Sequence, residues 1–233
     1  MKVGLILFLS WVPCAAAATV TGNAVLVNAD GIAVKMSDNA GIVVWLDPVG
    51  AAPASAAPGK SVTMNQRNQT FLPHVLAVQV GTAVDFPNSD PIFHNAFSNY
   101  EGQVFDLQLY APKASRRVVF RRPGMVHVFC NVHENMSAVI AVLPTPYFTV
   151  TGADGRFQIQ APAGNYRVHI WHERGQPESL TRAEQRITLA SEDVRLPEIQ
   201  ILQGAEVPAH NNKYGQPYFS VPDAHTYYPG GRH

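Results

Sequence analysis

The sequence predicts an all-β protein built of β-sandwiches. Short segments rich in Val, Ile, Phe and Tyr recur along the chain and are separated by Gly, Pro, Asn and Asp, as strands are separated by turns. The 17 glycines and 18 prolines among 233 residues suit many turns, and only residues 177–186 have any helical character. Many short strands joined in this way are typical of Greek-key sandwiches.

Each expected strand is a short run of β-branched and aromatic residues that ends at a turn former. In the first part of the chain these runs lie at residues 19–27, 41–48, 61–66, 74–80 and 83–88. In the second part they lie at residues 116–123, 125–130, 137–144, 156–162, 166–173 and 184–190.

Three segments depart from the strand pattern. Residues 49–60 form a connector of small residues and prolines with nothing to bury. Residues 143–147 contain two prolines, which stop a strand and indicate a junction. The tail, residues 204–233, shows no apolar period, so we expect an irregular arm held down by its aromatic residues.

The N-terminus, residues 1–18, is predicted to be an export signal. A lysine precedes an apolar stretch, and Ala16 and Ala18 fit the small-residue rule for cleavage before Thr19. The apolar stretch is about half the ~20 residues that a membrane span requires. We therefore expect the mature protein in the periplasm or outside the cell. Cleavage removes Cys14 and leaves Cys130 as a single cysteine, which cannot form an internal disulfide.

The composition limits the classes of partner. Acidic and basic residues are equal at 17 each, so the formal net charge is zero and no basic field is available for nucleic acid or an anionic membrane. No later segment is long and apolar enough for a membrane span. The 46% of hydrophobic residues can build sizeable cores, and the length predicts one large or two ordinary domains.

The stretch VFCNVHENMSAV, residues 128–139, carries Cys130, His133 and Met136 at even three-residue steps. Thiolate and thioether ligands combined with imidazole select copper or zinc over hard cations. Structural zinc sites usually use pairs of Cys and His, and no second cysteine survives export. Two His and one Cys with a weak axial Met are the ligands of blue-copper electron-transfer sites. His94, within residues 86–98, supplies the second histidine.

Residues 61–144 resemble the cupredoxin family. The match lies in FLPHVLAVQVGTAVDFPNSDPIFHNAF and in RRPGMVHVFCNVHENMSAVIAVL, where the Cys-x-x-His-x-x-Met spacing is the short ligand loop seen in amicyanin. The resemblance implies a Greek-key sandwich with one type 1 copper ion. It implies that the copper ligands are His94, Cys130, His133 and Met136.

The same resemblance implies roles around the ligands. Asn95 falls where the family fixes the Cys-bearing loop through hydrogen bonds. His133 is expected nearest the surface, as the exit for an electron, with a redox protein docking beside it. Glu134 departs from the apolar patch of amicyanin-like loops and leaves the docking mode open. The chain is expected to act as a monomer.

Other functions remain to be distinguished from electron transfer. A nucleophilic enzyme built on Cys130 and His133 would need neither Met136 nor His94, so the chain is not expected to be an enzyme. Copper sequestration or delivery is the main alternative, in which His74 or the tail histidines would bind further copper. We expect His74 instead to be an exposed residue at the start of a strand, because it has no ligand partner nearby in the sequence. A structural protein with a vestigial site is disfavoured because all four ligands are present.

Residues 148–175 resemble the carboxypeptidase-regulatory-like family, a smaller transthyretin-type β-sandwich. The hairpin TGADGRF and the strand start PAGNYRV carry the match, with Asp154-Gly155 at a tight turn. The opening strands of that family match residues 20–48, far upstream. These strands could begin the copper sandwich instead. We prefer a discontinuous domain of residues 19–60 with 147–203, into which a copper domain, residues 61–146, is inserted.

Overall fold

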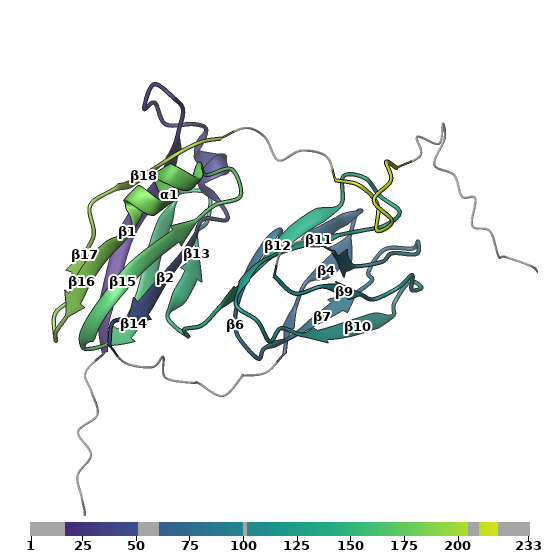
Figure 1. Cartoon of the computed structure of the whole chain (residues 1–233), viewed down its shortest axis with the longest axis horizontal. Helices are drawn as coiled ribbons and strands as arrows, with labels where there is room; N and C mark the ends of the chain where they lie inside the picture. The colour runs from purple at the N-terminus through teal and green to yellow at the C-terminus, as the bar shows by residue number, and fades with distance from the viewer. Residues whose placement is uncertain (1–16, 51–60, 100–101, 205–209, 219–233) are drawn as a thin grey trace, which may run out of the picture. The chain divides into compact units, whose positions relative to one another are not determined.

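A computed structural model describes residues 17–50, 61–99, 102–204 and 210–218. The chain divides into two compact units. Among the described residues, unit 1 comprises residues 17–50, 147–171 and 175–203, and unit 2 comprises residues 61–99, 102–146, 172–174, 204 and 210–218. Strands dominate both units (Figure 1), so the all-β prediction is confirmed.

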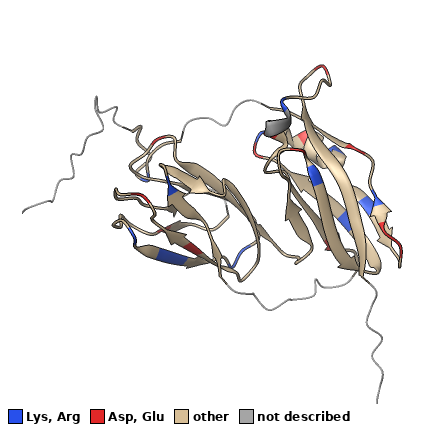
Figure 2. Ribbon diagram, turned by 180° about the vertical axis from the view of Figure 1, so that it is seen from behind, with Lys and Arg blue, Asp and Glu red and all other residues tan. Residues whose placement is uncertain are grey.

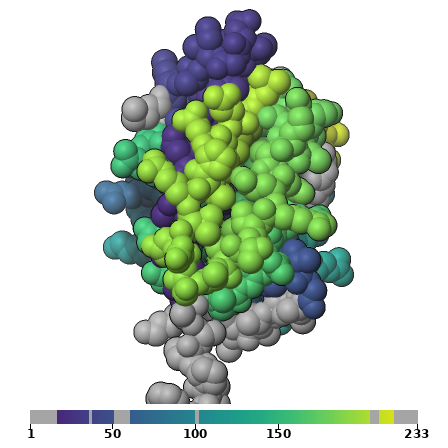
Figure 3. All heavy atoms as spheres, turned by 90° about the vertical axis from the view of Figure 1, so that its left-hand side faces the viewer, coloured from purple at the N-terminus to yellow at the C-terminus, as the bar shows by residue number. Residues whose placement is uncertain are grey.

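One sheet of unit 1 is organised around its first strand, β1 (Ala17–Val27). β1 pairs antiparallel with β14 (Arg156–Pro162) on one side. On the other side it pairs in parallel with two short strands, β17 (Val194–Arg195) and β18 (Ile199–Leu202). Figure 3 shows this mixture of distant segments, with N-terminal residues in purple beside yellow-green ones from the end of the unit.

The second sheet of unit 1 has the order β13-β2-β15-β16. Its strands are β13 (Phe148–Val150), β2 (Val43–Pro48), β15 (Gly164–Trp171) and β16 (Gln185–Leu189). A short helix, α1 (Pro177–Ala183), links β15 to β16, and a 3-10 helix, η1 (Met36–Asn39), precedes β2. The helix lies within the one segment that the sequence marked as helical.

The core of unit 1 is filled by the alternate residues of these strands. Residues of β14 alternate between exposed and buried, so Phe157 and Ile159 enter a core shared with β1 and β2. The turn into β14 requires glycine, because Gly155 has φ +72° and an added Cβ would lie 2.1 Å from the Ala24 carbonyl oxygen. The family assignment of this unit, and the domain limits drawn from it, stay predictions.

The pairing inside unit 1 makes its downstream half dependent on its upstream half. β14 pairs with β1, and β15 pairs with β2, so residues 147–203 alone lack both partners. We expect a fragment of residues 147–203 to show no cooperative unfolding, because Phe157, Ile159 and Ile170 would face solvent. Circular dichroism during urea titration measures this. A cooperative transition of the isolated fragment would contradict the dependence.

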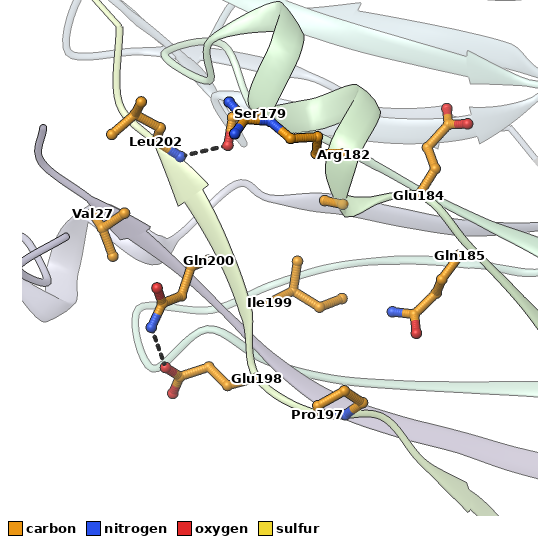
Figure 4. A pocket seen from close by; sticks show the side chains of 11 residues that line it. Val27, Ser179, Arg182, Glu184, Gln185, Pro197, Glu198, Ile199, Gln200 and Leu202 are labelled. Carbon is orange, nitrogen blue, oxygen red and sulfur yellow. Dashed lines mark hydrogen bonds between the residues drawn. The ribbon is translucent and has the colours of Figure 1, made fainter.

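A surface pocket of about 440 Å³ lies in unit 1 between α1, β16 and β18 (Figure 4). The Ser179 hydroxyl oxygen accepts a 2.8 Å hydrogen bond from the Leu202 backbone N–H and ties α1 to β18 at its edge. The lining contains none of the four predicted copper ligands.

His169 of β15 is held by two carboxylates. Its Nε2 lies 3.1 Å from Asp47 Oδ2 and its Nδ1 2.7 Å from Glu184 Oε1, while the ring stacks on Trp45 at 5.0 Å between centroids. Burial lowers the pKa of His169, but hydrogen bonds to Asp47 and Glu184 outweigh it and raise the pKa above the ordinary value of 6.5. The folded state therefore holds the doubly protonated ring more firmly than the unfolded chain does.

This arrangement predicts a pH-dependent stability of unit 1. A raised folded-state pKa contributes stability that is complete below pH 6.5 and is lost as the pH rises through the raised value. Trp45 and Trp171 lie on β2 and β15, so tryptophan fluorescence follows the unfolding of this unit. We expect the urea midpoint to fall between about pH 6 and about pH 9, and to fall less in a His169→Gln chain. Equal pH dependence in both chains would contradict the prediction.

Unit 2 contains two sheets and a small hairpin. The larger sheet has the order β6-β12-β11-β8-β9 and comprises Val75–Gln79, Ser137–Leu143, Gly124–Phe129, Phe97–Ser98 and Phe105–Asp106. The smaller has the order β10-β7-β3 and comprises Ser115–Val119, Ala83–Pro87 and Val62–Thr63. The hairpin pairs β4 (Asn65–Arg67) with β5 (Thr70–Leu72) through a turn in which Asn68 and Gln69 both have φ 55°.

The core of unit 2 leads directly to the predicted ligands. Along β11, Val126 and Val128 are buried in the core, and Cys130 continues the same alternation. His127 and Phe129 belong to the opposite face of the strand. The larger sheet therefore delivers Cys130 to the buried end of the sandwich.

Charges are mixed on both units. Figure 2 shows Lys and Arg interspersed with Asp and Glu, in keeping with the formal net charge of zero. Among the described residues no helix has the length and apolar character of a membrane span. The predicted export signal falls largely outside the described residues, although β1 begins at Ala17, two residues before the predicted cleavage point.

Candidate metal centre

Two segments of unit 2 carry the predicted ligands. His94 precedes β8 and is fixed by paired backbone hydrogen bonds with Tyr110, of 3.2 and 2.8 Å. Cys130 follows β11, and the loop to β12 carries His133 and Met136. The loop closes on itself, because Cys130 N donates to Met136 O at 3.0 Å and Met136 N donates to His133 O at 3.1 Å.

The donor atoms of two histidines and the cysteine converge. Cys130 Sγ lies 3.8 Å from His94 Nδ1 and 3.5 Å from His133 Nδ1. All three donor atoms lie within 4.8 Å of one another. No other group of three His, Cys, Asp or Glu side chains converges in this way within the part of the chain that the structure describes.

These separations suit a trigonal metal ion. Bonds of about 2.3 Å to thiolate and about 2.0 Å to imidazole, as in zinc sites, would place sulfur and nitrogen about 3.7 Å apart at 120°. The observed distances of 3.5 and 3.8 Å bracket that value. The two sulfur–nitrogen distances therefore suit the binding of one first-row metal ion.

Met136 is a fourth candidate donor. It is fully buried in the same core as Cys130, and it lies on the loop that carries His133. A thioether is a soft donor that suits copper, and a Met beside His₂Cys is characteristic of electron-transfer copper sites. The structure thus contains a His-Cys-His-Met-like site.

Asp90 orients His94 from behind. Its Oδ2 lies 2.7 Å from His94 Nε2, and both side chains are buried. The carboxylate also accepts backbone hydrogen bonds from Asn68 at 2.6 Å and Gln69 at 2.9 Å, in the β4–β5 turn. Burial opposes ionisation of Asp90, but the hydrogen bonds of Gln69, His94 and Asn68 together lower its pKa. With Nε2 donating to the carboxylate, the Nδ1 lone pair faces Cys130.

Burial shifts the pKa values of His133 and Cys130 in opposite directions. Burial lowers the pKa of His133 to about 4, assisted by the neighbouring His94. His133 is therefore neutral near pH 7 and offers a lone pair. Burial also raises the pKa of the Cys130 thiol. Because a metal binds the thiolate, metal binding here must release the thiol proton.

The ligands differ in their access to solvent. His94, Cys130 and Met136 are fully buried, whereas His133 is partly exposed. The exposed side chains of Val132 and Glu134 flank it. His133 is thus the member of the group nearest the surface, as the sequence led us to expect.

Asn95 connects the two ligand-bearing segments. Its Oδ1 accepts a 3.2 Å hydrogen bond from Asn131 N, next to Cys130, and its Nδ2 donates to Asp106 Oδ1 at 2.8 Å. This is the loop-fixing hydrogen bond that the family resemblance implied. Asp90 was missed in the sequence, although an acid four residues before His94 was the available signal.

His74 takes part in other contacts. Its Nδ1 lies 3.1 Å from Ser137 O, and its Nε2 lies 2.9 Å from Glu173 Oε2. The His74 side chain is 47% exposed, and the hydrogen bond to Glu173 raises its pKa although partial desolvation lowers it. His74 belongs to no metal-like group among the described residues.

The similarity of this chain to a curated protein is partial. No protein-family model matches the chain. Over 59 residues the chain is 41% identical to methylamine utilization protein MauL of Methylorubrum extorquens; the match covers 25% of this chain and 52% of that protein. The chain thus spans about half the length of this curated relative.

Solved structures similar to the chain include three copper-related proteins. A copper-containing nitrite reductase from Thermus scotoductus SA-01 is 28% identical with TM-score 0.36, covering 42% of this chain and 25% of that one. A purple cupredoxin from Nitrosopumilus maritimus is 22% identical with TM-score 0.32, covering 36% and 100%. A copper(I) form of an amicyanin variant is 15% identical with TM-score 0.34, covering 43% and 98%.

Unit 2 has a cupredoxin-like fold. Its two sheets enclose one core, and the cysteine ends a central strand of the larger sheet. The second histidine and the methionine follow on the loop to the next strand, while the first histidine comes from a segment far upstream. The predicted Greek-key sandwich and the predicted grouping of these residues agree with this arrangement.

Proposed function

We propose that the chain is an exported mononuclear type 1 copper protein that carries single electrons between redox partners. The observation that carries the proposal is the convergence of His94 Nδ1, Cys130 Sγ and His133 Nδ1 at trigonal spacing. Met136 is the proposed axial ligand of the same ion. The partial similarity to MauL, whose name refers to methylamine utilization, supports a redox setting.

The residues of the site favour electron transfer without large rearrangement. Copper bound here would supply a one-electron Cu(II)/Cu(I) couple. The site would hold the ion in a geometry between those that the two oxidation states prefer. Asp90 fixes the tautomer and orientation of His94, and the closed turn from Cys130 to Met136 fixes the remaining donors. Burial excludes water from three of the four side chains. The four side chains are therefore held in position before an electron arrives.

The partly exposed His133 is the proposed path for the electron. A redox protein would dock over the loop around it, where Val132 is 43% exposed and Glu134 is exposed. The acidic side chain beside an apolar one favours a partner whose surface offers a basic group next to an apolar patch. We propose a periplasmic or secreted location, with cleavage before Thr19.

Copper sequestration or delivery is the competing function, and metal stoichiometry separates the two. The carrier function predicts one tightly bound copper ion per chain and a reversible Cu(II)/Cu(I) couple with rapid electron self-exchange. Titration of the full chain, followed by voltammetry, measures both. More than one tight copper ion, or rapid loss of copper to a chelating partner, would favour copper handling.

We also propose that unit 1 is an accessory module of the carboxypeptidase-regulatory-like type, made of residues 19–60 with 147–203. Its described residues include no metal-like cluster. A role in docking or in stability fits a β-sandwich in which His169 is held between the carboxylates of Asp47 and Glu184.

A further inference from the structure

The C-terminal segment of residues 210–218, here called the strap, folds back over the end of β11. The strap is internally ordered by Asn212, whose Oδ1 accepts hydrogen bonds from Tyr214 N at 2.9 Å and Gln216 N at 3.1 Å. Gly215, with φ +76°, completes the turn, and Gly215 N donates to Asn212 O at 2.9 Å. The strap is thus a defined structure within unit 2.

The strap contacts three consecutive residues at the start of the ligand loop. The His210 ring lies against Phe129, with 4.2 Å between ring centroids. The Tyr218 hydroxyl donates to the Cys130 carbonyl oxygen at 2.5 Å. Lys213 N donates to Asn131 Oδ1 at 2.9 Å. The backbone on both sides of Cys130 is therefore held from outside the sandwich.

A closed ring of hydrogen bonds includes the strap. Asn131 N donates to Asn95 Oδ1, and Asn95 Nδ2 donates to Asp106 Oδ1. Lys213 Nζ lies 2.8 Å from Asp106 Oδ2, and Lys213 N returns to Asn131. The ring joins the segment after His94, strand β9, the ligand loop and the strap.

We propose that the strap is a working part of the metal centre and that Tyr218 is a positioning residue for Cys130. The Tyr218 hydroxyl is the donor to the Cys130 carbonyl oxygen. The His210 Nδ1 atom lies 3.2 Å from the Tyr218 oxygen and holds the ring in place. Without the strap, the Cys130 carbonyl loses this donor and the ligand loop can open.

The test uses the buried thiol of Cys130 as a reporter, in a full chain that carries Cys14→Ser and no metal. Cys130 is fully buried, so iodoacetamide reaches it only when the loop opens. Tyr218→Phe removes one hydroxyl, and loss of one such hydrogen bond corresponds to about fivefold more opening. We expect Cys130 to be alkylated about fivefold faster in that chain.

Tyr214→Phe is the matched control. Tyr214 belongs to the same strap, but its side chain is 72% exposed. Cys130 in the Tyr214→Phe chain should be alkylated at the same rate as in the chain whose strap is unchanged. Equal rates in all three chains, or acceleration by Tyr214→Phe alone, would overturn the proposal.

A second measurement separates positioning from general stability. In copper-loaded chains, Tyr218→Phe should shift the position of the thiolate-to-copper band while the urea midpoint of unit 1, followed by Trp45, stays unchanged. An unshifted band would show that Tyr218 does not position Cys130. This spectroscopic arm rests on the proposed function, whereas the alkylation arm does not. A chain that binds no copper would therefore refute the function and leave the strap to be decided by alkylation.

Discussion

Cys130→Ser should abolish the visible colour of the copper-loaded protein. The intense band of a type 1 site arises from charge transfer between a thiolate and Cu(II), and Cys130 is the one thiol among the converging side chains. Loss of a residue that hydrogen-bonds to a metal ligand typically weakens metal binding roughly 10–100-fold, and removing the ligand itself should weaken copper binding by more than that. Absorption spectra and copper titration measure the two effects.

His127→Gln is the control for this substitution. His127 lies on β11 three residues before Cys130 but belongs to the opposite face of the strand. The control chain should keep the colour and bind one copper ion. A Cys130→Ser chain that retained the band would remove Cys130 from the site.

Met136→Gln should keep copper bound and lower the reduction potential. The thiolate and two imidazoles dominate affinity, while a long axial contact mainly adjusts the relative stability of the two oxidation states. An oxygen donor is harder than a thioether and favours Cu(II). A tenfold preference for Cu(II) lowers the potential of a one-electron couple by about 59 mV. Voltammetry measures the shift.

Two further variants separate the loss of an axial ligand from other effects of a substitution in the core. Met64→Gln buries the same amide in the same core, because Met64 is also fully buried there, and it should leave the potential unchanged. His94→Ala removes an equatorial donor and should weaken copper binding instead. An unchanged potential in Met136→Gln would show that Met136 is not the axial ligand.

Three of the four proposed ligands could be predicted from sequence spacing because they lie in one local pattern. Cys130, His133 and Met136 lie on one loop, and the strand alternation through Val126 and Val128 directs Cys130 inward. The regular strands followed from the same alternation, with ends that differ by a few residues; the run expected at 116–123, for example, ends at Val119 in β10. Local patterns of this kind are visible in one sequence.

The supporting contacts could not be predicted because they join segments far apart in the chain. Tyr218 reaches Cys130 across 88 residues, and Lys213 reaches Asp106 across 107. The tail was expected to be an irregular arm held by aromatic residues, and the structure shows which groups its residues 210–218 hold. The short strands β17 and β18 were also missed, since they have few residues and depend on β1 for their pairing.

The visible absorption spectrum of the purified full chain loaded with one equivalent of Cu(II) tests the central claim most directly. A thiolate at Cys130 between His94 and His133 predicts an intense charge-transfer band that disappears on reduction to Cu(I) and returns on oxidation. A tightly bound but colourless Cu(II) ion, or a chain that prefers zinc and takes up no copper, would contradict the assignment of a type 1 copper site.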